Sequence, residues 1–304
     1  MRKVILAAAT LAAFASPLSV STANAQAAAT APAAPASPHT FTGNVSVVSD
    51  YRFRGISQTY KLPALQGGFD YSHASGFYVG NWNSSVSGLS FPNGASLEMD
   101  LYGGWKTEFA NGVGLDIGGL YYYYPGSYYS TANGNNKPKY NNFELYAGLS
   151  YKWLSAKYSY ATTDYFGATG SAFGLNPLGL NPPPTNGLQG VNANGAGTGN
   201  FTGSNNAGSK GSQYFELNAN YEVAPKFTLN GHVGHLSVKN FTGFSYTDYK
   251  LGVSYDAGFA TLGLAFVGTN AKKEFYRVFE TAPNNTTSKV VSGDTVVLSI
   301  SKTF

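Results

Sequence analysis

The 304-residue sequence contains no cysteine, few charged residues and no long apolar stretch after its first residues. The absence of cysteine excludes disulfide bonds and thiolate metal sites. Charged residues make up 11% of the chain, whereas a soluble domain has about 25%. No run of about 18 or more apolar residues follows the first 25 positions, so helical membrane spans are excluded.

Aromatic residues and glycine are abundant instead. The sequence holds 23 tyrosines, 20 phenylalanines and 37 glycines. Together with the low charge, this composition is typical of a β-barrel whose outer face meets lipid. The formal net charge of +4 is too small to indicate binding of nucleic acid.

The first residues predict export. Arg2 and Lys3 precede a short apolar run, which ends before the small residues Ala23 and Ala25. This is the pattern of a cleaved signal peptide, predicted here at residues 1–25. An Ala- and Pro-rich stretch at 26–41 predicts an extended periplasmic lead-in. Residues 42–304 would then form the folded part of the mature protein.

Alternation of apolar and polar residues is the main secondary-structure signal. A strand places successive side chains on opposite faces, so alternation predicts strands with one face in lipid and one in a polar interior. We find twelve such segments, at 43–54, 64–72, 76–86, 96–108, 112–124, 142–152, 154–162, 212–223, 227–238, 246–256, 259–269 and 295–304.

The connections between these segments alternate between short and long. Outer-membrane barrels have short periplasmic turns and longer extracellular loops. We therefore predict an all-β fold, a single antiparallel transmembrane β-barrel of about 12 strands, with both termini in the periplasm. The Gly-, Asn- and Pro-rich segment 168–209 is predicted to be a long, flexible extracellular loop.

The last segment also predicts an assembly signal. Val296, Leu298, Ile300 and Phe304 share one face of the strand, and the chain ends on this aromatic residue. Such an ending resembles the signal by which the barrel-assembly machinery recognises bacterial outer-membrane proteins. Lys302 departs from that pattern, although its ammonium can reach the headgroups from a strand end.

Several motifs carry a family resemblance over essentially the whole chain after residue 41. They are DYRFRGISQ at 50–58, PALQGGFDY at 63–71, GFYVG at 76–80, LEMDLYGG at 97–104, YYYYPG at 121–126 and DYFG at 164–167. The chain resembles the TorF-type porin family, which is defined by the Gcw_chp domain. The resemblance implies a porin-like barrel in the bacterial outer membrane and no defined substrate. The segment 168–209 is longer than expected for this family.

Function is expected on the polar, inward faces of the strands, because positions facing lipid must stay apolar. A ring of charges in a narrow pore sets ion selectivity. The alternative is that these charges pair across the lumen and fill it. The predicted pore-lining residues are Asp50, Arg52, Arg54, Asp70, Glu98, Asp100, Lys106, Glu144, Lys157, Glu216 and Lys250.

The sequence favours a channel for passive diffusion of small hydrophilic solutes or ions, with a weak preference for cations because carboxylates are in excess. One alternative is a non-conducting surface barrel with a structural or adhesive role. An outer-membrane hydrolase is a weaker alternative, because the sequence has only four histidines. His232 and His235 fall on opposite faces of a strand, so they are poor joint metal ligands.

We therefore expect no enzyme activity, no catalytic residues, no metal and no cofactor. The expected partners are outer-membrane lipid and lipopolysaccharide, the barrel-assembly machinery and small hydrophilic solutes. No nucleic-acid partner is expected.

Overall fold

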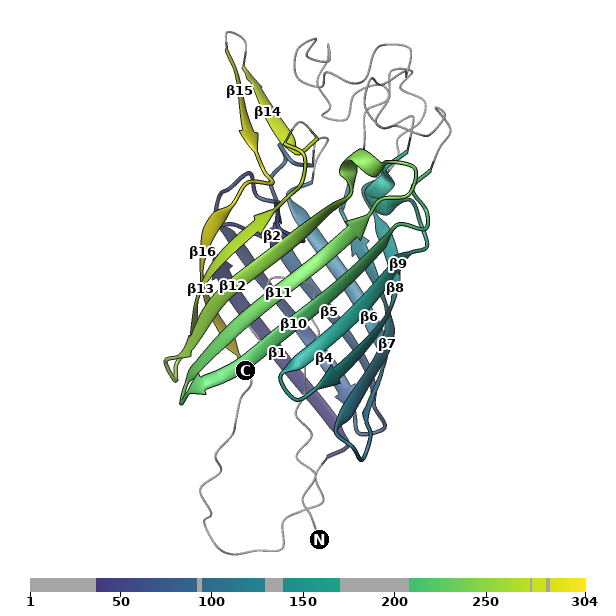
Figure 1. Ribbon diagram of the computed structural model, residues 1–304, viewed down its shortest axis with the longest axis vertical. Coiled ribbons are helices and arrows are strands. Elements are labelled where there is room, and N and C mark those ends of the chain that lie inside the picture. The colour runs from purple at the N-terminus through teal and green to yellow at the C-terminus, as the bar shows by residue number, and fades with distance from the viewer. Residues whose placement is uncertain (1–36, 92–94, 129–138, 170–207, 274, 283–284) are drawn as a thin grey trace, which may run out of the picture.

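The computed structural model describes residues 37–91, 95–128, 139–169, 208–273, 275–282 and 285–304. Within these residues twelve antiparallel strands close a barrel, in which each strand pairs with its neighbour and β1 pairs with both β4 and β16 (Figure 1). The barrel strands are β1 (His39–Val48), β4 (Ala64–His73), β5 (Phe77–Ser85), β6 (Leu97–Glu108), β7 (Val113–Tyr123), β8 (Asn142–Tyr151), β9 (Leu154–Ala161), β10 (Gln213–Ala224), β11 (Phe227–Ser237), β12 (Tyr246–Asp256), β13 (Thr261–Thr269) and β16 (Thr295–Thr303).

The predicted strands agree with the structure except at the beginning of the chain. Eleven of the twelve predicted segments match a barrel strand to within two residues at each end. The prediction of one strand over 43–54 is wrong. β1 begins at His39, inside the stretch predicted as lead-in, and leaves the barrel wall after Val48. The predicted signal peptide, residues 1–25, lies outside the described residues.

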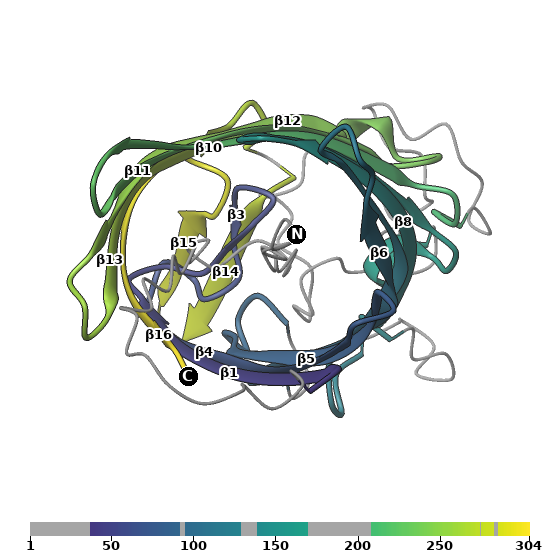
Figure 2. The same cartoon turned by 90° about the horizontal axis from the view of Figure 1, so that it is seen from below.

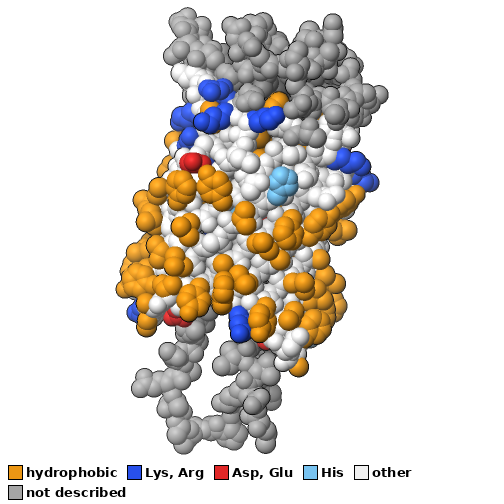
Figure 3. All heavy atoms as spheres, viewed as in Figure 1, with side chains coloured by type: hydrophobic (Ala, Val, Ile, Leu, Met, Phe, Trp, Pro, Cys, Tyr) orange, Lys and Arg blue, Asp and Glu red, His pale blue; other side chains and the backbone are white. Residues whose placement is uncertain are grey.

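Alternation sorts the side chains between the two faces of the barrel wall. On β6, Leu97 and Leu101 are exposed on the outside, whereas Glu98 and Asp100 are each 1% exposed. β13 and β16 continue this pattern, and their outward residues Leu264 and Leu298 lie opposite each other. Apolar side chains form a broad belt around the barrel (Figure 3). The outer face therefore matches a bilayer interior, and the fold is that of a transmembrane β-barrel.

The two ends of the barrel differ. The short links lie at the end where β16 finishes, and the long connections lie at the opposite end (Figure 1). The hairpin of β14 (Arg277–Ala282) and β15 (Asn285–Val290) rises from that opposite end, which we call the outer end. Most of the predicted loop 168–209, residues 170–207, lies outside the described residues. None of the helices in the described part of the chain has the length and hydropathy of a membrane span.

Two further strands lie inside the barrel rather than in its wall. They are β2 (Arg52–Phe53) and β3 (Ile56–Ser57), which pair with each other. Seen along the barrel axis, β3 falls within the ring of strands (Figure 2). We call residues 49–63, which connect β1 to β4 and contain this small hairpin, the inserted segment.

Candidate pore lining and the inserted segment

The inserted segment turns back on itself at Arg54 and Gly55. Both have positive φ angles, of 47° and 77°. A side chain on residue 55 would collide with Thr269 and approach Asp248 Cβ to 2.9 Å. Glycine is therefore required both for the turn and for close contact with β12 and β13. The tip of the hairpin thus packs against the wall at β12 and β13, three and two strands away from β1 in the barrel.

Arg54 attaches this tip to another part of the wall. Its Nη1 and Nη2 donate hydrogen bonds to the two carboxylate oxygens of Glu144 on β8, at 3.0 and 2.7 Å. Its guanidinium also lies 4.1 Å from the ring centroid of Tyr214 on β10. Arg54 and Glu144 side chains are each 3% exposed. A two-point ion pair of this kind holds one orientation, so it positions the hairpin as well as binding it.

Glu98 is a second point of attachment. Its carboxylate accepts hydrogen bonds from Tyr51 Oη at 2.7 Å and from Tyr124 Oη at 2.8 Å. Tyr51 belongs to the inserted segment and is 1% exposed. Nearby, neither carboxylate oxygen of Asp100 has a hydrogen-bond partner among the described residues, although the side chain is buried.

Arg52 holds the base of the inserted segment. Its Nε donates to Asp50 Oδ2 at 2.7 Å. Its Nη1 donates to the backbone carbonyls of Gly55, Val291 and Gly293 at 2.9–3.1 Å. The segment is thereby linked to the connection between β15 and β16. Burial lowers the pKa of Lys61 at the outer end of this segment, and the nearby positive charge of Arg52 acts in the same direction.

The structure places the predicted pore-lining residues in two groups. Asp50, Arg52 and Arg54 were predicted on a wall strand, which is wrong, because they lie on the inserted segment within the lumen. The remaining predicted residues do lie on barrel strands, in the inward register: Asp70, Glu98, Asp100, Lys106, Glu144, Lys157, Glu216 and Lys250.

Many of these charges are paired, as the space-filling alternative expected. In addition to the arginine pairs, Lys157 Nζ lies 3.1 Å from Glu216 Oε1. His232 Nε2 lies 2.8 Å from Asp248 Oδ2, an interaction that did not enter the predicted site. His232 faces inward and His235 outward, as their three-residue spacing predicted.

Tyrosines fill one side of the lumen, and they were not among the predicted site residues. Tyr102 Oη donates to Asp70 at 2.5 Å. Tyr78 Oη donates to Asp116 at 2.6 Å and is hydrogen-bonded to Tyr146. The alternation on β6 already placed Tyr102 in the polar register with Glu98 and Asp100. That position was the available signal, because a tyrosine facing inward brings a polar group and a large ring into the lumen.

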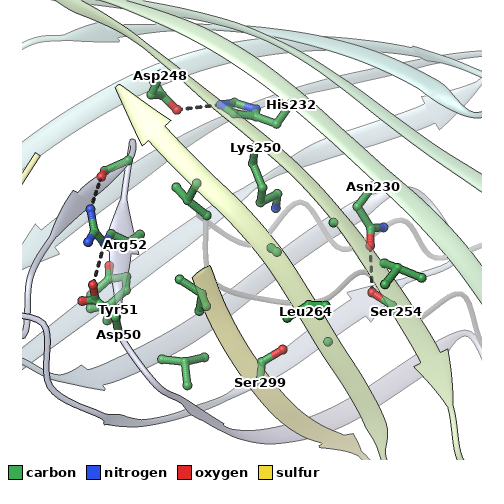
Figure 4. A pocket seen from close by; sticks show the side chains of 18 of the residues that line it. Asp50, Tyr51, Arg52, Asn230, His232, Asp248, Lys250, Ser254, Leu264 and Ser299 are labelled. Atoms are coloured by element: carbon green, nitrogen blue, oxygen red, sulfur yellow. Dashed lines mark hydrogen bonds and ion pairs between the residues drawn. The ribbon is translucent and has the colours of Figure 1, made fainter. Parts of the chain in front are cut away.

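The inserted segment separates two cavities. The inner cavity, of about 110 Å³, is bounded by Asp50, Tyr51, Arg52 and Gly55 of the segment and by the inner faces of β10–β13 and β16 (Figure 4). The outer cavity, of about 210 Å³, is bounded by Phe53, Ile56, Ser57 and Gln58 on the other side of the segment and by many aromatic rings, among them Phe91, Tyr124, Tyr165, Phe166 and Tyr246. Different residues of one short segment therefore line the two cavities.

Comparison with known proteins places the chain in a family. A model of the family described as "Bacterial protein of unknown function (Gcw_chp)" matches residues 32–304. The chain belongs to this family. That match does not extend to the TorF-type label, which stays a prediction. No curated protein sequence matches the chain.

Solved structures of porins are similar to the chain at a coarse level. A NanC porin has 8% identity and a TM-score of 0.44, and the match covers 86% of this chain and 98% of that one. A KdgM porin, solved in complex with disordered oligogalacturonate, has 7% identity and a TM-score of 0.44, and the match covers 87% and 99% of the two chains. At these values the likeness carries no argument about the solute or the mechanism.

Proposed function

We propose that this protein is an outer-membrane channel for passive diffusion of small hydrophilic solutes, with the inserted segment as its constriction. The observation that carries the proposal is the closed barrel, apolar outside and polar inside, in which a single short segment separates two cavities. A closed barrel satisfies all backbone hydrogen bonds within the lipid. The difference between short and long links supports insertion with the inner end toward the periplasm.

The proposal includes the partners expected of such a barrel. Outer-membrane lipid surrounds the apolar belt, and lipopolysaccharide lies at the outer end. The barrel-assembly machinery inserts the chain after its signal peptide is removed. Barrels of about 8 strands are filled by side chains and those of 16–18 strands leave an aqueous channel. A twelve-stranded barrel lies between these cases, so a short inserted segment is sufficient to narrow it.

A weak preference for cations is the finer part of the proposal. Carboxylates outnumber basic groups in the lumen, but Asp50, Glu144 and Glu216 are neutralised by ion pairs. Any preference then depends mainly on the inward carboxylates that have no ion pair among the described residues, Asp70, Glu98, Asp100 and Asp116. Because so few unpaired carboxylates remain, the preference should be small.

Planar-bilayer recording of the refolded mature chain, residues 26–304, tests the proposal. Discrete conductance steps with a reversal potential slightly on the cation side are the expected result. A folded barrel that stays silent at all voltages would contradict the channel. Such a result would favour the non-conducting surface barrel, an alternative for which the divided lumen already provides a structural reason.

A further inference from the structure

Lys250 on β12 lines the inner cavity without a fixed partner (Figure 4). Among the described residues, it forms no hydrogen bond and no ion pair. The carboxylates of Glu216 and Asp248 lie close enough to interact with its charge. However, Glu216 is paired with Lys157, and Asp248 is hydrogen-bonded to Tyr214 Oη and His232 Nε2. A cation in a narrow lumen attracts an anionic ligand more strongly than it would in bulk water.

Arg52 contributes a second donor to the same cavity. Its Nε and Nη1 are engaged, but its Nη2 is buried and has no hydrogen-bond partner among the described residues. Arg52 comes from the inserted segment and Lys250 from the wall, so the two cations approach the cavity from different elements (Figure 4). A buried donor without a partner is costly, and a bound oxygen atom would remove that cost.

The wall beside Lys250 leaves room for a ligand. It consists of small inward-facing side chains, Gly252 and Ser254 on β12, Gly263 and Ala265 on β13 and Ser299 on β16. The volume of about 110 Å³ exceeds the roughly 10–15 Å³ that a cavity needs to hold one water molecule. The hydroxyl group of Ser254 and the amide groups of Asn220 and Asn230 supply further polar contacts at the end of the cavity that lies away from the outer end of the barrel.

We propose that the inner cavity is a binding site for a small oxyanion, a carboxylate or a phosphate group, which docks on Lys250 with Arg52 as the second contact. This inference rests on the proposed function, because the site would lie on the route of a solute through the channel. It specifies the chemical class of that solute. Binding itself does not require conduction. A local site of this kind is compatible with a weak overall preference of the lumen for small cations, because the two depend on different groups.

Titration of the isotope-labelled, detergent-solubilised mature chain tests the site. The amide signals of Gly252 and Ser254 report on the cavity. Acetate, inorganic phosphate and acetamide are the probes, and acetamide has the shape of acetate without its charge. We expect saturable shifts with acetate, with phosphate or with both, and the arm that saturates identifies the oxyanion. Equal responses to acetate and acetamide, or no saturation with either oxyanion, would overturn the proposal.

Two variants and a matched control complete the test. Lys250→Met should weaken binding by about tenfold or more, because a hydrogen bond to a charged group is lost. Lys302→Met removes the same charge from the outward, exposed face of β16, and should bind as the parent does. Ala265→Leu keeps both cations but occupies the cavity, and it should also abolish saturation. Parental affinity in either Lys250→Met or Ala265→Leu would refute the site, so the test survives if one of them fails to fold.

The outcomes separate this inference from the proposed function. Saturable acetate binding by a barrel that is silent in bilayers would reject the channel and retain the site. Conductance without oxyanion binding would retain the channel and reject the site.

Discussion

Arg54 and Glu144 lie 90 positions apart in the sequence, and their side chains meet in a two-point ion pair inside the barrel. One partner belongs to the inserted segment and the other to β8. Both are almost fully shielded from water. This pair is therefore one of the contacts that position the inserted segment in the lumen, and it can be tested by changing either side chain or both.

Arg54→Met should destabilise the barrel strongly, because it leaves the Glu144 carboxylate buried without its cation. Removing one partner of a buried ion pair costs about 3–5 kcal/mol. The double variant Arg54→Met with Glu144→Leu should recover most of the loss, since no unpaired charge remains. Thermal loss of the heat-modifiable, folded band in electrophoresis measures the effect. Equal stability of the single variant and the parent would show that the pair does not hold the segment.

Replacing the inserted segment should open the lumen. Val48 and Ala64 are paired partners at the ends of β1 and β4. A Gly-Ser link of about two to four residues can therefore replace residues 49–63 and close the hairpin directly. We expect a several-fold larger single-channel conductance, because the two cavities would then communicate. A matched chain with the Gly-Ser link in place of the short turn at residues 74–76 should keep the parental conductance. Unchanged conductance without the inserted segment would show that it is not the constriction.

The two ends of the predicted loop 168–209 form contacts with the barrel, so the part that can be removed is shorter than the predicted loop. Ser209 is fully buried, its Oγ donates to the carbonyl of Ala168 at 2.5 Å, and it accepts from the Tyr165 backbone N–H at 2.8 Å. Thr169 and Gly208 form a β-bridge just beyond these contacts. Replacing 170–207 with a short Gly-Ser link should therefore leave folding intact. Replacing the whole of 168–209 should lower stability, since buried backbone groups lose their partners. Equal melting of the two shortened chains would contradict this division.

The wall of the barrel could be predicted from sequence because lipid imposes a strict alternation on every strand. β12, Tyr246–Asp256, is an example. The alternation of apolar outward and polar inward residues predicted both the first and the last residue of this strand correctly. The same reasoning failed at the start of the chain. Asp50, Arg52 and Arg54 continue the inward register of β1, and Tyr51 and Phe53 resemble residues that face lipid.

The physical cause of this failure is that alternation distinguishes polar from apolar environments but not lipid from protein core. Tyr51 and Phe53 are 1% and 7% exposed, because they pack against Trp82 and Tyr122 in the lumen rather than against lipid. A strand in the wall and a segment folded inside it therefore show the same pattern. The one local sign of a turn was the Arg54-Gly55 pair, and single glycines are frequent throughout this chain. The pairing of Arg54 with Glu144 depends on long-range geometry that no local pattern contains.

Phe304 is the last testable element, as the proposed assembly signal. Its backbone N–H donates to the Gly43 carbonyl at 2.9 Å and its carbonyl accepts from Gly43 N–H at 2.7 Å, so it extends the β1–β16 closure. Its ring is 70% exposed and lies over Gly43, where a side chain would approach Phe304 Cε2 to 2.7 Å. Phe304 therefore closes the barrel, and the proposed recognition during assembly would be a second role that can be separated from it by experiment.

Deleting Phe304 should lower the amount of folded barrel in the outer membrane far more than Ser301→Ala, a change on the inward face of the same strand. Refolding the purified chains into detergent separates the two roles, because no assembly machinery is present there. If Phe304 acts as a signal, the deleted chain should refold nearly as well as the parent but fail to accumulate in cells. If closure is its main role, refolding in detergent should fall as well. Parental outer-membrane levels of the deleted chain would exclude the signal, because the machinery would then have assembled the barrel without this residue.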